Sequence, residues 1–447
     1  MNNKLTSAGL LVAALLVSSA SFAQVKIGAN PTTISSNANL DVEDNLGRHM
    51  VVLNNGNVGI GIAAPVVKLN VENGNFSVNQ GADNAFTGTI QASAAIGSGN
   101  TNRSYYSLTV GQNNVTDGQN SLAIGFQNFT GASGNNSFSY GQTNQSTGAN
   151  SISGGFASFA SGLNSIAIGH TTQATANSSA AFGQLSEASA NFAFATGYNN
   201  KARGEMSTAM GRENLASGYS SVALGWGNQA TDAVGIALGY FCSANGNTSI
   251  AMGKNAKAFH ASSVVISDGT GADFGSFGNN TISMRFSSGY RFYTNAAHST
   301  GVLLGPSATS WGSISDIRAK KDISGIENGL STIMKLQPKK YHYKNSDNKQ
   351  FSLGFIAQEV VKVLPEIVDV PENKEEYLSI RYSELVPVLT KAIQEQQTQI
   401  AEQKAEITNL KAQISQMDKL EAKLADLEAK LAGGSGENSA AVTPVSK

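Results

Sequence analysis

The chain is poor in cysteine and in charge, and both shortages restrict what it can be. Its one cysteine, Cys242, cannot form a disulfide within the chain, so stability must come from repetition or oligomerisation. Charged residues make up only 14% of the sequence and the formal net charge is −1, which gives no electrostatic basis for binding nucleic acid or an anionic membrane. The hydrophobic content of 40% is nevertheless too high for simple disorder.

Long hydrophobic runs and clusters of ligand residues are also missing. Beyond residue 23, no stretch reaches the ~18–20 apolar residues that a membrane-spanning helix needs. The five histidines are scattered without metal-ligand spacing, so we expect no metal site and no cofactor. Acidic residues are few and widely spaced in the middle of the chain, which disfavours a glycosidase with paired carboxylates.

The N-terminal residues have the pattern of an export signal. Lys4 precedes an apolar run from Leu10 to Val17, and small residues follow up to Ala23. This pattern predicts a signal peptide over residues 1–23 that is cleaved after Ala23. We therefore expect a protein that is secreted by a bacterium or held on its cell surface.

A glycine recurs along the low-charge part of the chain with a fixed period. Successive glycines are fourteen residues apart, except for one interval of sixteen between Gly125 and Gly141. Serine usually precedes each glycine by four positions and alanine by two, with larger apolar residues between them, as in residues 165–169. A period that holds over so many copies indicates a repeat architecture. The glycines are at positions 97, 111, 125, 141, 155, 169, 183, 197, 211, 225, 239 and 253.

Each five-residue unit alternates small and large side chains, which predicts a strand with two different faces. Fourteen residues fit two short strands and two turns, which is one coil of a β-solenoid. At about 4.8 Å per coil, twelve coils would form a rod of roughly 55–60 Å. We expect the large apolar residues to line the interior of the stacked coils, and the Ser/Ala face to allow neighbouring chains to approach.

This pattern resembles the head repeats of trimeric autotransporter adhesins over about residues 90–267. The resemblance implies a left-handed parallel β-roll that assembles as a homotrimer. Upstream, within residues 24–89, the segment from Asn57 to Val71 looks like one common in bacterial secreted and phage tail-fibre proteins. It favours a fibre over an enzyme.

The charged part of the chain contains a series of short motifs. Residues 282–293 alternate around Ser287-Ser288-Gly289, which predicts a β-hairpin within a linker region over 268–314. Five further motifs follow in order, Trp311–Ile323, Leu336–Tyr343, Leu353–Val360, Leu364–Val368 and Tyr382–Leu389. Together they resemble the C-terminal intramolecular chaperone of phage endosialidases and other tail spikes, over about residues 284–410. We place this small α+β domain at residues 315–390.

The resemblance implies that the chain cleaves itself once, after the chaperone has helped three chains to assemble. Carried onto this sequence, Ser315 is the nucleophile, Lys320 is the general base, and the bond between Ser315 and Asp316 is cut. Lysine, with an ordinary pKa of about 10.4, is protonated at neutral pH, so the base must be desolvated or lie near another cation. Arg318 and Lys321 are the candidate neighbours. The activity would be that of a single-turnover serine autoprotease without an external substrate.

A heptad pattern follows the chaperone motifs. Apolar residues recur every seven residues and predict a coiled coil over residues 391–432, before a disordered tail over 433–447. We favour three strands because both resemblances imply trimers. Two functions remain open: a fibre that releases its C-terminal part, and the same fibre with an uncleaved domain that acts as a permanent trimerisation clamp. The seam is formed by Ile393, Ile400, Ile407, Leu410, Ile414, Met417, Leu420, Leu424, Leu427 and Leu431.

Overall fold

The computed structural model describes residues 24–29, 32–35, 37–66, 68–71, 76–79, 85–86, 93–344 and 349–434. The predicted signal peptide, residues 1–23, lies outside the described residues, as does most of the predicted tail. The chain divides into two compact units, of which the first ends at Ser313 and the second begins at Ile314. No helix in the described ranges is long and apolar enough to cross a membrane.

The first unit begins with a five-stranded sheet in which the strands follow the chain order. The outer pairs, β1/β2 and β4/β5, are parallel, and the two inner pairs are antiparallel. Ala38, Val51 and Leu53 form its small apolar core. The strands are β1 (Val25–Gly28), β2 (Ala38–Glu43), β3 (His49–Leu53), β4 (Val58–Ile60) and β5 (Leu69–Val71).

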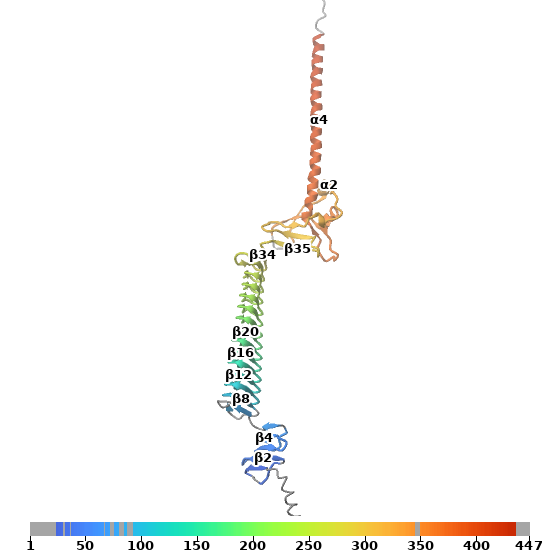
Figure 1. The fold of residues 1–447 in the computed structure, drawn as a ribbon. Coiled ribbons are helices and arrows are strands. Elements are labelled where there is room, and N and C mark those ends of the chain that lie inside the picture. Colours follow the sequence, from blue (N-terminus) through green and yellow to red (C-terminus); the bar gives the residue numbers. More distant parts are fainter. Residues whose placement is uncertain are drawn as a thin grey trace, which may run out of the picture. The chain divides into compact units, whose positions relative to one another are not determined.

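The fourteen-residue repeat forms a parallel β-solenoid with two sheets, seen as the long stack of strands in Figure 1. A typical coil contributes a five-residue strand to one sheet and a two-residue strand to the other. Each residue pairs with the residue one repeat later, so Ile166 pairs with Ala180 and Ala180 with Phe194. The interval of sixteen residues leaves this register intact, because Leu122 still pairs with Phe138. The predicted solenoid is therefore confirmed.

The solenoid extends further in both directions than residues 90–267. Its larger sheet has 15 strands and its smaller sheet has 14. The larger sheet contains β6 (Phe76–Asn79), β8 (Ala94–Ser98), β10 (Leu108–Gln112), β12 (Leu122–Phe126), β14 (Phe138–Gln142), β16 (Ile152–Phe156), β18 (Ile166–His170), β20 (Ala180–Gln184), β22 (Phe194–Tyr198), β24 (Thr208–Arg212), β26 (Val222–Trp226), β28 (Ile236–Tyr240), β30 (Ile250–Lys254), β32 (Val264–Asp268) and β34 (Ile282–Arg285). The smaller sheet contains β7 (Ala85–Phe86), β9 (Thr101–Asn102), β11 (Val115–Thr116), β13 (Phe129–Thr130), β15 (Gln145–Ser146), β17 (Phe159–Ala160), β19 (Gln173–Ala174), β21 (Glu187–Ala188), β23 (Lys201–Ala202), β25 (Leu215–Ala216), β27 (Gln229–Ala230), β29 (Ser243–Ala244), β31 (Ala256–Ala258) and β33 (Phe274–Gly275).

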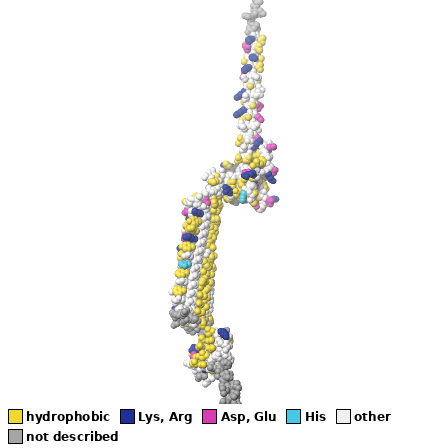
Figure 2. All heavy atoms as spheres, viewed as in Figure 1, with side chains coloured by type: hydrophobic (Ala, Val, Ile, Leu, Met, Phe, Trp, Pro, Cys, Tyr) yellow, Lys and Arg dark blue, Asp and Glu magenta, His cyan; other side chains and the backbone are white. Residues whose placement is uncertain are grey.

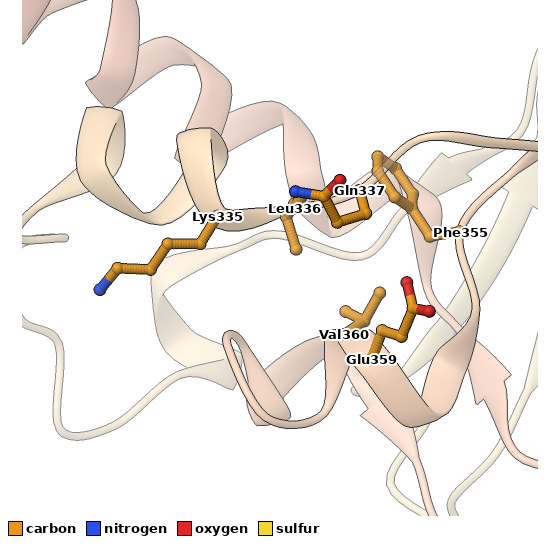
Figure 3. Close-up of a pocket in the computed structure, with 6 residues that line it drawn as sticks. All are labelled: Lys335, Leu336, Gln337, Phe355, Glu359 and Val360. Carbon is orange, nitrogen blue, oxygen red and sulfur yellow. The ribbon is translucent and has the colours of Figure 1, made fainter.

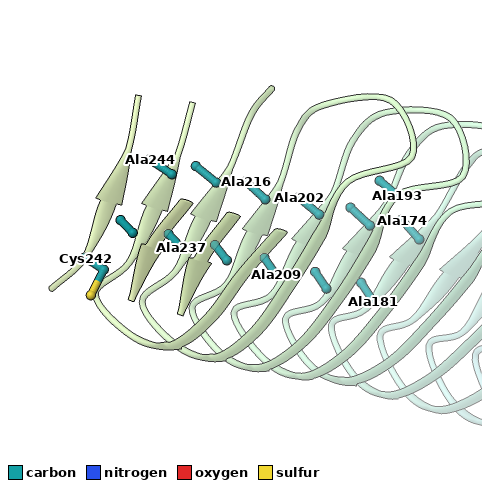
Figure 4. Close-up of a cluster of buried hydrophobic side chains, with 14 of the residues drawn as sticks. Ala174, Ala181, Ala193, Ala202, Ala209, Ala216, Ala237, Cys242 and Ala244 are labelled. Carbon is teal, nitrogen blue, oxygen red and sulfur yellow. The ribbon is translucent and has the colours of Figure 1, made fainter. Parts of the chain in front are cut away.

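The interior of the solenoid is filled by small side chains, so the predicted interior of large apolar residues was wrong. The alanines of both sheets are fully buried and face one another in columns, as Figure 4 shows for Ala209 and Ala216. The large apolar residues between them point outward, and Ile124 is 37% exposed. The short turns hold the two sheets so close that only small side chains fit between them. The large residues instead form a continuous hydrophobic stripe on the outside (Figure 2).

The repeating glycine is required by the stacking of the coils. Gly225 has a φ of +120°, and a Cβ atom added there would lie 2.1 Å from the carbonyl oxygen of Gly239 on the next coil. An L side chain rarely adopts this backbone conformation. Any larger residue would push neighbouring coils apart, which explains the fixed period.

A column of asparagines runs through the buried corner of the coil. The Asn114 amide donates to the carbonyl oxygens of Val110 and Gly125, and its Oδ1 accepts from the backbone and side-chain nitrogens of Asn128. Cys242 takes the place of asparagine one coil after Asn228 and is fully buried, and this burial raises the pKa of its thiol. The Asn column comprises Asn100, Asn114, Asn128, Asn144, Asn200, Asn214 and Asn228.

The predicted hairpin over residues 282–293 was wrong. Its first half is β34, the last strand of the solenoid, which pairs in parallel with β32. Its second half is β35 (Tyr290–Tyr293), which pairs with β36 (Gly301–Leu304), and β36 pairs with β37 (Gly312–Ser313). The alternation of apolar residues located both strands, but it could not reveal that they pair with different partners.

The second unit combines short helices and strands with one long helix. Its apolar core contains Leu336, Val360, Ile367, Val368 and Leu385. The predicted seam residues of the coiled coil lie on the long helix α4, and most of them are exposed. The elements are η2 (Ile317–Ala319), α2 (Gly329–Lys335), β38 (Lys339–Tyr341), β39 (Ser352–Gly354), α3 (Ala357–Val360), η3 (Pro365–Ile367), β40 (Val368–Asp369), β41 (Ser379–Ile380), η4 (Tyr382–Glu384) and α4 (Leu385–Gly434).

Candidate functional site

The start of the second unit brings the predicted nucleophile and base together. Lys320 Nζ donates a hydrogen bond of 2.7 Å to Ser315 Oγ. Between them lies the single 3₁₀ turn η2, which is closed by hydrogen bonds from the Ala319 and Lys320 amides to the carbonyl oxygens of Asp316 and Ile317. This turn reverses the chain, which is why a spacing of five residues places the two side chains in contact.

Asp316 organises the turn that follows the predicted cleavage point. Its Oδ1 accepts a hydrogen bond of 2.8 Å from the Arg318 amide and so caps the N-terminus of η2. The Arg318 guanidinium also binds the carboxylate through both oxygens, at 2.9 and 2.7 Å. These hydrogen bonds from Arg318 lower the pKa of Asp316. The bond between Ser315 and Asp316 is therefore followed by a rigid, charge-stabilised turn.

Arg318 is one of the two candidate cations for lowering the pKa of Lys320. Its charge is matched by Asp316, because the two side chains form a bidentate ion pair. Ser315 and Lys320 are both exposed in the single chain. The serine and lysine are thus in hydrogen-bonding distance, but the burial that a lysine base needs is not supplied by their own chain.

Three cavities in the described part of the second unit are lined by neither Ser315 nor Lys320. The smallest of these has a volume of about 10 Å³ and lies between Leu336, Phe355 and Glu359, shown in Figure 3. It is large enough for one water molecule at most. Glu359 lies 3.5 Å from the Lys339 ammonium in an exposed ion pair, which agrees with a structural role for this residue.

Another of these three cavities is an aromatic groove of about 650 Å³. Its lining is dominated by rings and aliphatic side chains, and Lys344 and Gln358 are among its few polar members. Such a surface suits an apolar segment of polypeptide better than a reacting substrate. The groove is lined by Tyr341, Tyr343, Lys344, Phe355, Ile356, Ala357, Gln358, Tyr377, Leu378, Ser379, Ile380 and Tyr382.

The N-terminal sheet contains a cluster of charges that has the composition, but not the geometry, of a hydrolase triad. His49 Nδ1 lies 2.8 Å from Asp41 Oδ1 and 3.5 Å from Ser35 Oγ. A triad needs the serine and the carboxylate on opposite ring nitrogens, whereas here both face Nδ1. Lys26 forms ion pairs with Asp41 and Glu43, so the cluster balances a fully buried carboxylate.

No group of three or more metal-ligating side chains lies within the described ranges. One surface feature was missed from the sequence, a row of aromatic and cationic side chains on the solenoid that begins at Tyr198. A partial signal was present, because the residue after the repeat glycine is of mixed type in the earlier coils but is aromatic or basic in each of the last five.

Two families of known proteins match this chain. Residues 315–369 match the family described as chaperone of endosialidase. Segments of the solenoid match the YadA head domain repeat, over residues 106–128, 160–186, 174–200, 202–228, 216–241 and 244–266. No curated protein matches the chain. Segments of the solenoid are therefore similar to the head repeats of trimeric autotransporter adhesins, and residues 315–369 are similar to the endosialidase chaperone domain.

Proposed function

We propose that the protein is a secreted, trimeric surface fibre whose C-terminal chaperone domain assembles the trimer and then cuts itself off between Ser315 and Asp316. The observation that carries the cleavage proposal is the hydrogen bond of 2.7 Å between Lys320 Nζ and Ser315 Oγ. The family of the chaperone domain supports a self-cleaving peptidase, and the head repeats support an adhesin-like fibre.

Trimer formation is supported by the apolar surface of the single chain. The hydrophobic stripe of the solenoid exposes side chains such as Ile96, Ile124, Met210 and Met252. Full burial of an exposed side chain of this kind contributes about 1.5–3 kcal/mol, so covering the 37–39% that remains exposed would contribute about 0.6–1.1 kcal/mol for each, on coil after coil. The seam of α4 exposes a second row, which three parallel helices would bury.

The cleavage chemistry uses only groups of this chain and one water molecule. Lys320, when neutral, takes the hydroxyl proton of Ser315, and Ser315 Oγ attacks the carbonyl carbon of its own residue. The C–N bond to Asp316 breaks as the proton passes to the departing nitrogen, which leaves the Ser315 acyl group as a strained four-membered lactone with its own Oγ. Water then opens this lactone, so that Ser315 ends in a carboxylate and recovers its hydroxyl group.

Assembly provides the switch for this reaction. A lysine base must lose its proton, and burial away from water favours the neutral form. Lys320 is exposed in the single chain, so its burial has to come from neighbouring chains. Cleavage then follows trimerisation, and an unassembled chain keeps its chaperone.

Intact-mass spectrometry of the purified protein tests the cleavage. We expect two fragments that separate after Ser315 in the wild type, and one uncut chain in Ser315→Ala and Lys320→Ala. Lys374→Ala, which changes an exposed lysine away from Ser315 and Lys320, is the control and should still cleave. An uncut wild-type chain that is trimeric by light scattering would refute the peptidase and leave a permanent trimerisation clamp.

Export is tested separately from cleavage. N-terminal sequencing of the protein recovered outside the producing cell should begin at Gln24. Recovery only inside the cell, with Met1 or Asn2 at the N-terminus, would refute secretion.

A further inference from the structure

The strands of the solenoid place one residue of each coil in a straight row after the repeat glycine. Tyr198, Arg212, Trp226, Tyr240 and Lys254 are in register, each paired through the backbone with the next. We call these five residues the aromatic row. At ~4.8 Å per coil, it is about 19 Å long.

The side chains of the aromatic row contact one another without a break. The Arg212 guanidinium lies 5.5 Å from the ring centre of Tyr198 and 4.6 Å from that of Trp226. The Trp226 and Tyr240 rings pack edge to face at 5.1 Å, and the Lys254 ammonium lies 5.7 Å from the Tyr240 ring. The side chains are therefore held in place before any ligand arrives.

Polar groups that could orient a ligand lie beside these rings. Glu213 accepts a hydrogen bond of 3.2 Å from the Trp226 indole nitrogen and another of 3.2 Å from Arg212 Nε. The Arg212 and Glu213 side chains remain 54% and 37% exposed, so they keep donors and acceptors free for other partners. Because this pair is neutral overall, the centre of the row carries no net charge.

The aromatic row is not part of the hydrophobic stripe that we assign to the trimer interface. The stripe contains the residues one and three positions before each repeat glycine, and the row contains the residue one position after it. Figure 2 shows a second line of side chains along the solenoid, separate from the continuous stripe, in which hydrophobic and basic groups alternate. Tyr198 and Trp226 are 39% and 38% exposed.

We propose that the aromatic row binds a linear, uncharged glycan that lies along the fibre axis. The C–H groups on one face of a sugar ring are apolar and weakly positive, and they pack against the negative face of an aromatic ring. Hydroxyl groups around the sugar take hydrogen bonds from an arginine and give them to a glutamate, the two types present at the centre of the row. Exposed aromatic patches of this kind mark binding sites.

The chemistry of the row disfavours other ligands. An acidic polysaccharide would meet Glu213 beside the only arginine of the row, and the solenoid carries few further cations. A globular protein would need a much wider apolar surface than one line of rings. The inference rests on the proposed trimeric fibre only in that the row must stay exposed after assembly.

The fluorescence of Trp226 provides the test, because the chain has only two tryptophans. In the full chain carrying Trp311→Phe, Trp226 is the sole tryptophan and can be excited selectively over the tyrosines. The trimer is first verified by light scattering and then titrated with cellohexaose, xylohexaose and N-acetylchitohexaose. We expect a saturable change in emission with at least one of these hexasaccharides and a smaller effect of heparin.

Variants decide whether the row is the site. Tyr198→Ala should weaken binding about tenfold or more, which corresponds to ~1.4 kcal/mol, and Tyr198→Phe should restore most of it. Tyr219→Ala is the matched control, since this exposed tyrosine lies outside the row. Circular dichroism checks that each variant is folded.

Three results would overturn the inference. They are no saturable change in Trp226 emission with any neutral hexasaccharide, equal losses of affinity in Tyr198→Ala and Tyr219→Ala, or binding of heparin alone. An intact trimer that ignores all glycans would refute this inference and leave the fibre standing. A failure to form trimers would refute the proposed fibre itself.

Discussion

The Asn column makes a quantitative prediction about the stability of the solenoid. The Asn214 amide nitrogen donates to Asn200 Oδ1, the Met210 carbonyl and the Gly225 carbonyl at 2.7–2.9 Å. Its Oδ1 accepts from the backbone and side chain of Asn228 at 3.0 and 3.1 Å. The amide has two N–H donors for these three acceptors, so at most four of the hydrogen bonds form at once. At about 0.5–1.5 kcal/mol for each, Asn214→Ala should cost roughly 2–6 kcal/mol.

Two further substitutions separate hydrogen bonding from packing. Asn214→Ser should cost less than Asn214→Ala, because Ser186 fills the equivalent position with a hydrogen bond of its own to the Gly197 carbonyl. Asn214→Asp has almost the same shape but faces two carbonyl oxygens, so its buried charge should make it the most harmful at neutral pH. Protonation gives the introduced carboxyl group one hydrogen-bond donor, so the loss of stability should become smaller as the pH falls.

Urea unfolding followed by circular dichroism measures these effects. Asn247→Ala is the control, because Asn247 lies on an exposed turn, and it should change stability by less than ~0.5 kcal/mol. Equal losses of stability in Asn214→Ala and Asn247→Ala would refute this prediction. It would also be refuted if Asn214→Asp were no more harmful at neutral than at acidic pH.

Three other predictions follow from single contacts. Gly225→Ala should destabilise the solenoid by more than about 3 kcal/mol, because the new Cβ atom meets the Gly239 carbonyl oxygen, and thermal unfolding will measure it. Ser207→Ala should increase the free energy of unfolding by up to ~1 kcal/mol and so raise the midpoint of unfolding. The reason is that the buried Ser207 hydroxyl has no hydrogen-bond partner in the part of the chain described. Burial opposes ionisation of Asp41, but hydrogen bonds from His49 and Ser35 outweigh it and lower its pKa. A lowered folded pKa gives stability that is fully present above the unfolded value of about 3.9 and is lost as the pH falls through the folded value. The protection of the N-terminal sheet against hydrogen exchange, relative to the intrinsic exchange rate at each pH, should therefore fall on acidification in the wild type and less in Asp41→Asn.

The sequence was a reliable guide wherever one backbone position repeated. The interval between Gly211 and Gly225 predicted both the coil length and the strand register, because a Cβ atom at either position would strike the next coil. The same pattern could not reveal which face is inside. Alternation shows only that two faces differ, and the narrow space between the sheets decided that alanine would fill the interior.

The candidate site was predictable in part. Local turn geometry accounts for the contact between Ser315 and Lys320, because a 3₁₀ turn of three residues lies between them. The ion pair between Arg318 and Asp316 was not predictable, since it depends on side-chain geometry. The aromatic row was equally hidden, because Tyr198 and Trp226 are 28 positions apart in the sequence and become neighbours of Arg212 only after the coils stack.

By itself, the sequence determined the repeat, the solenoid and the helical C-terminus, because all three depend on periodic patterns that a local stretch of chain already contains. Only the tertiary structure decided which side chains are buried, which strands pair after Arg285, and which residues form a continuous surface. These properties depend on contacts between distant residues, and the distance between the two sheets and the register of the coils set those contacts.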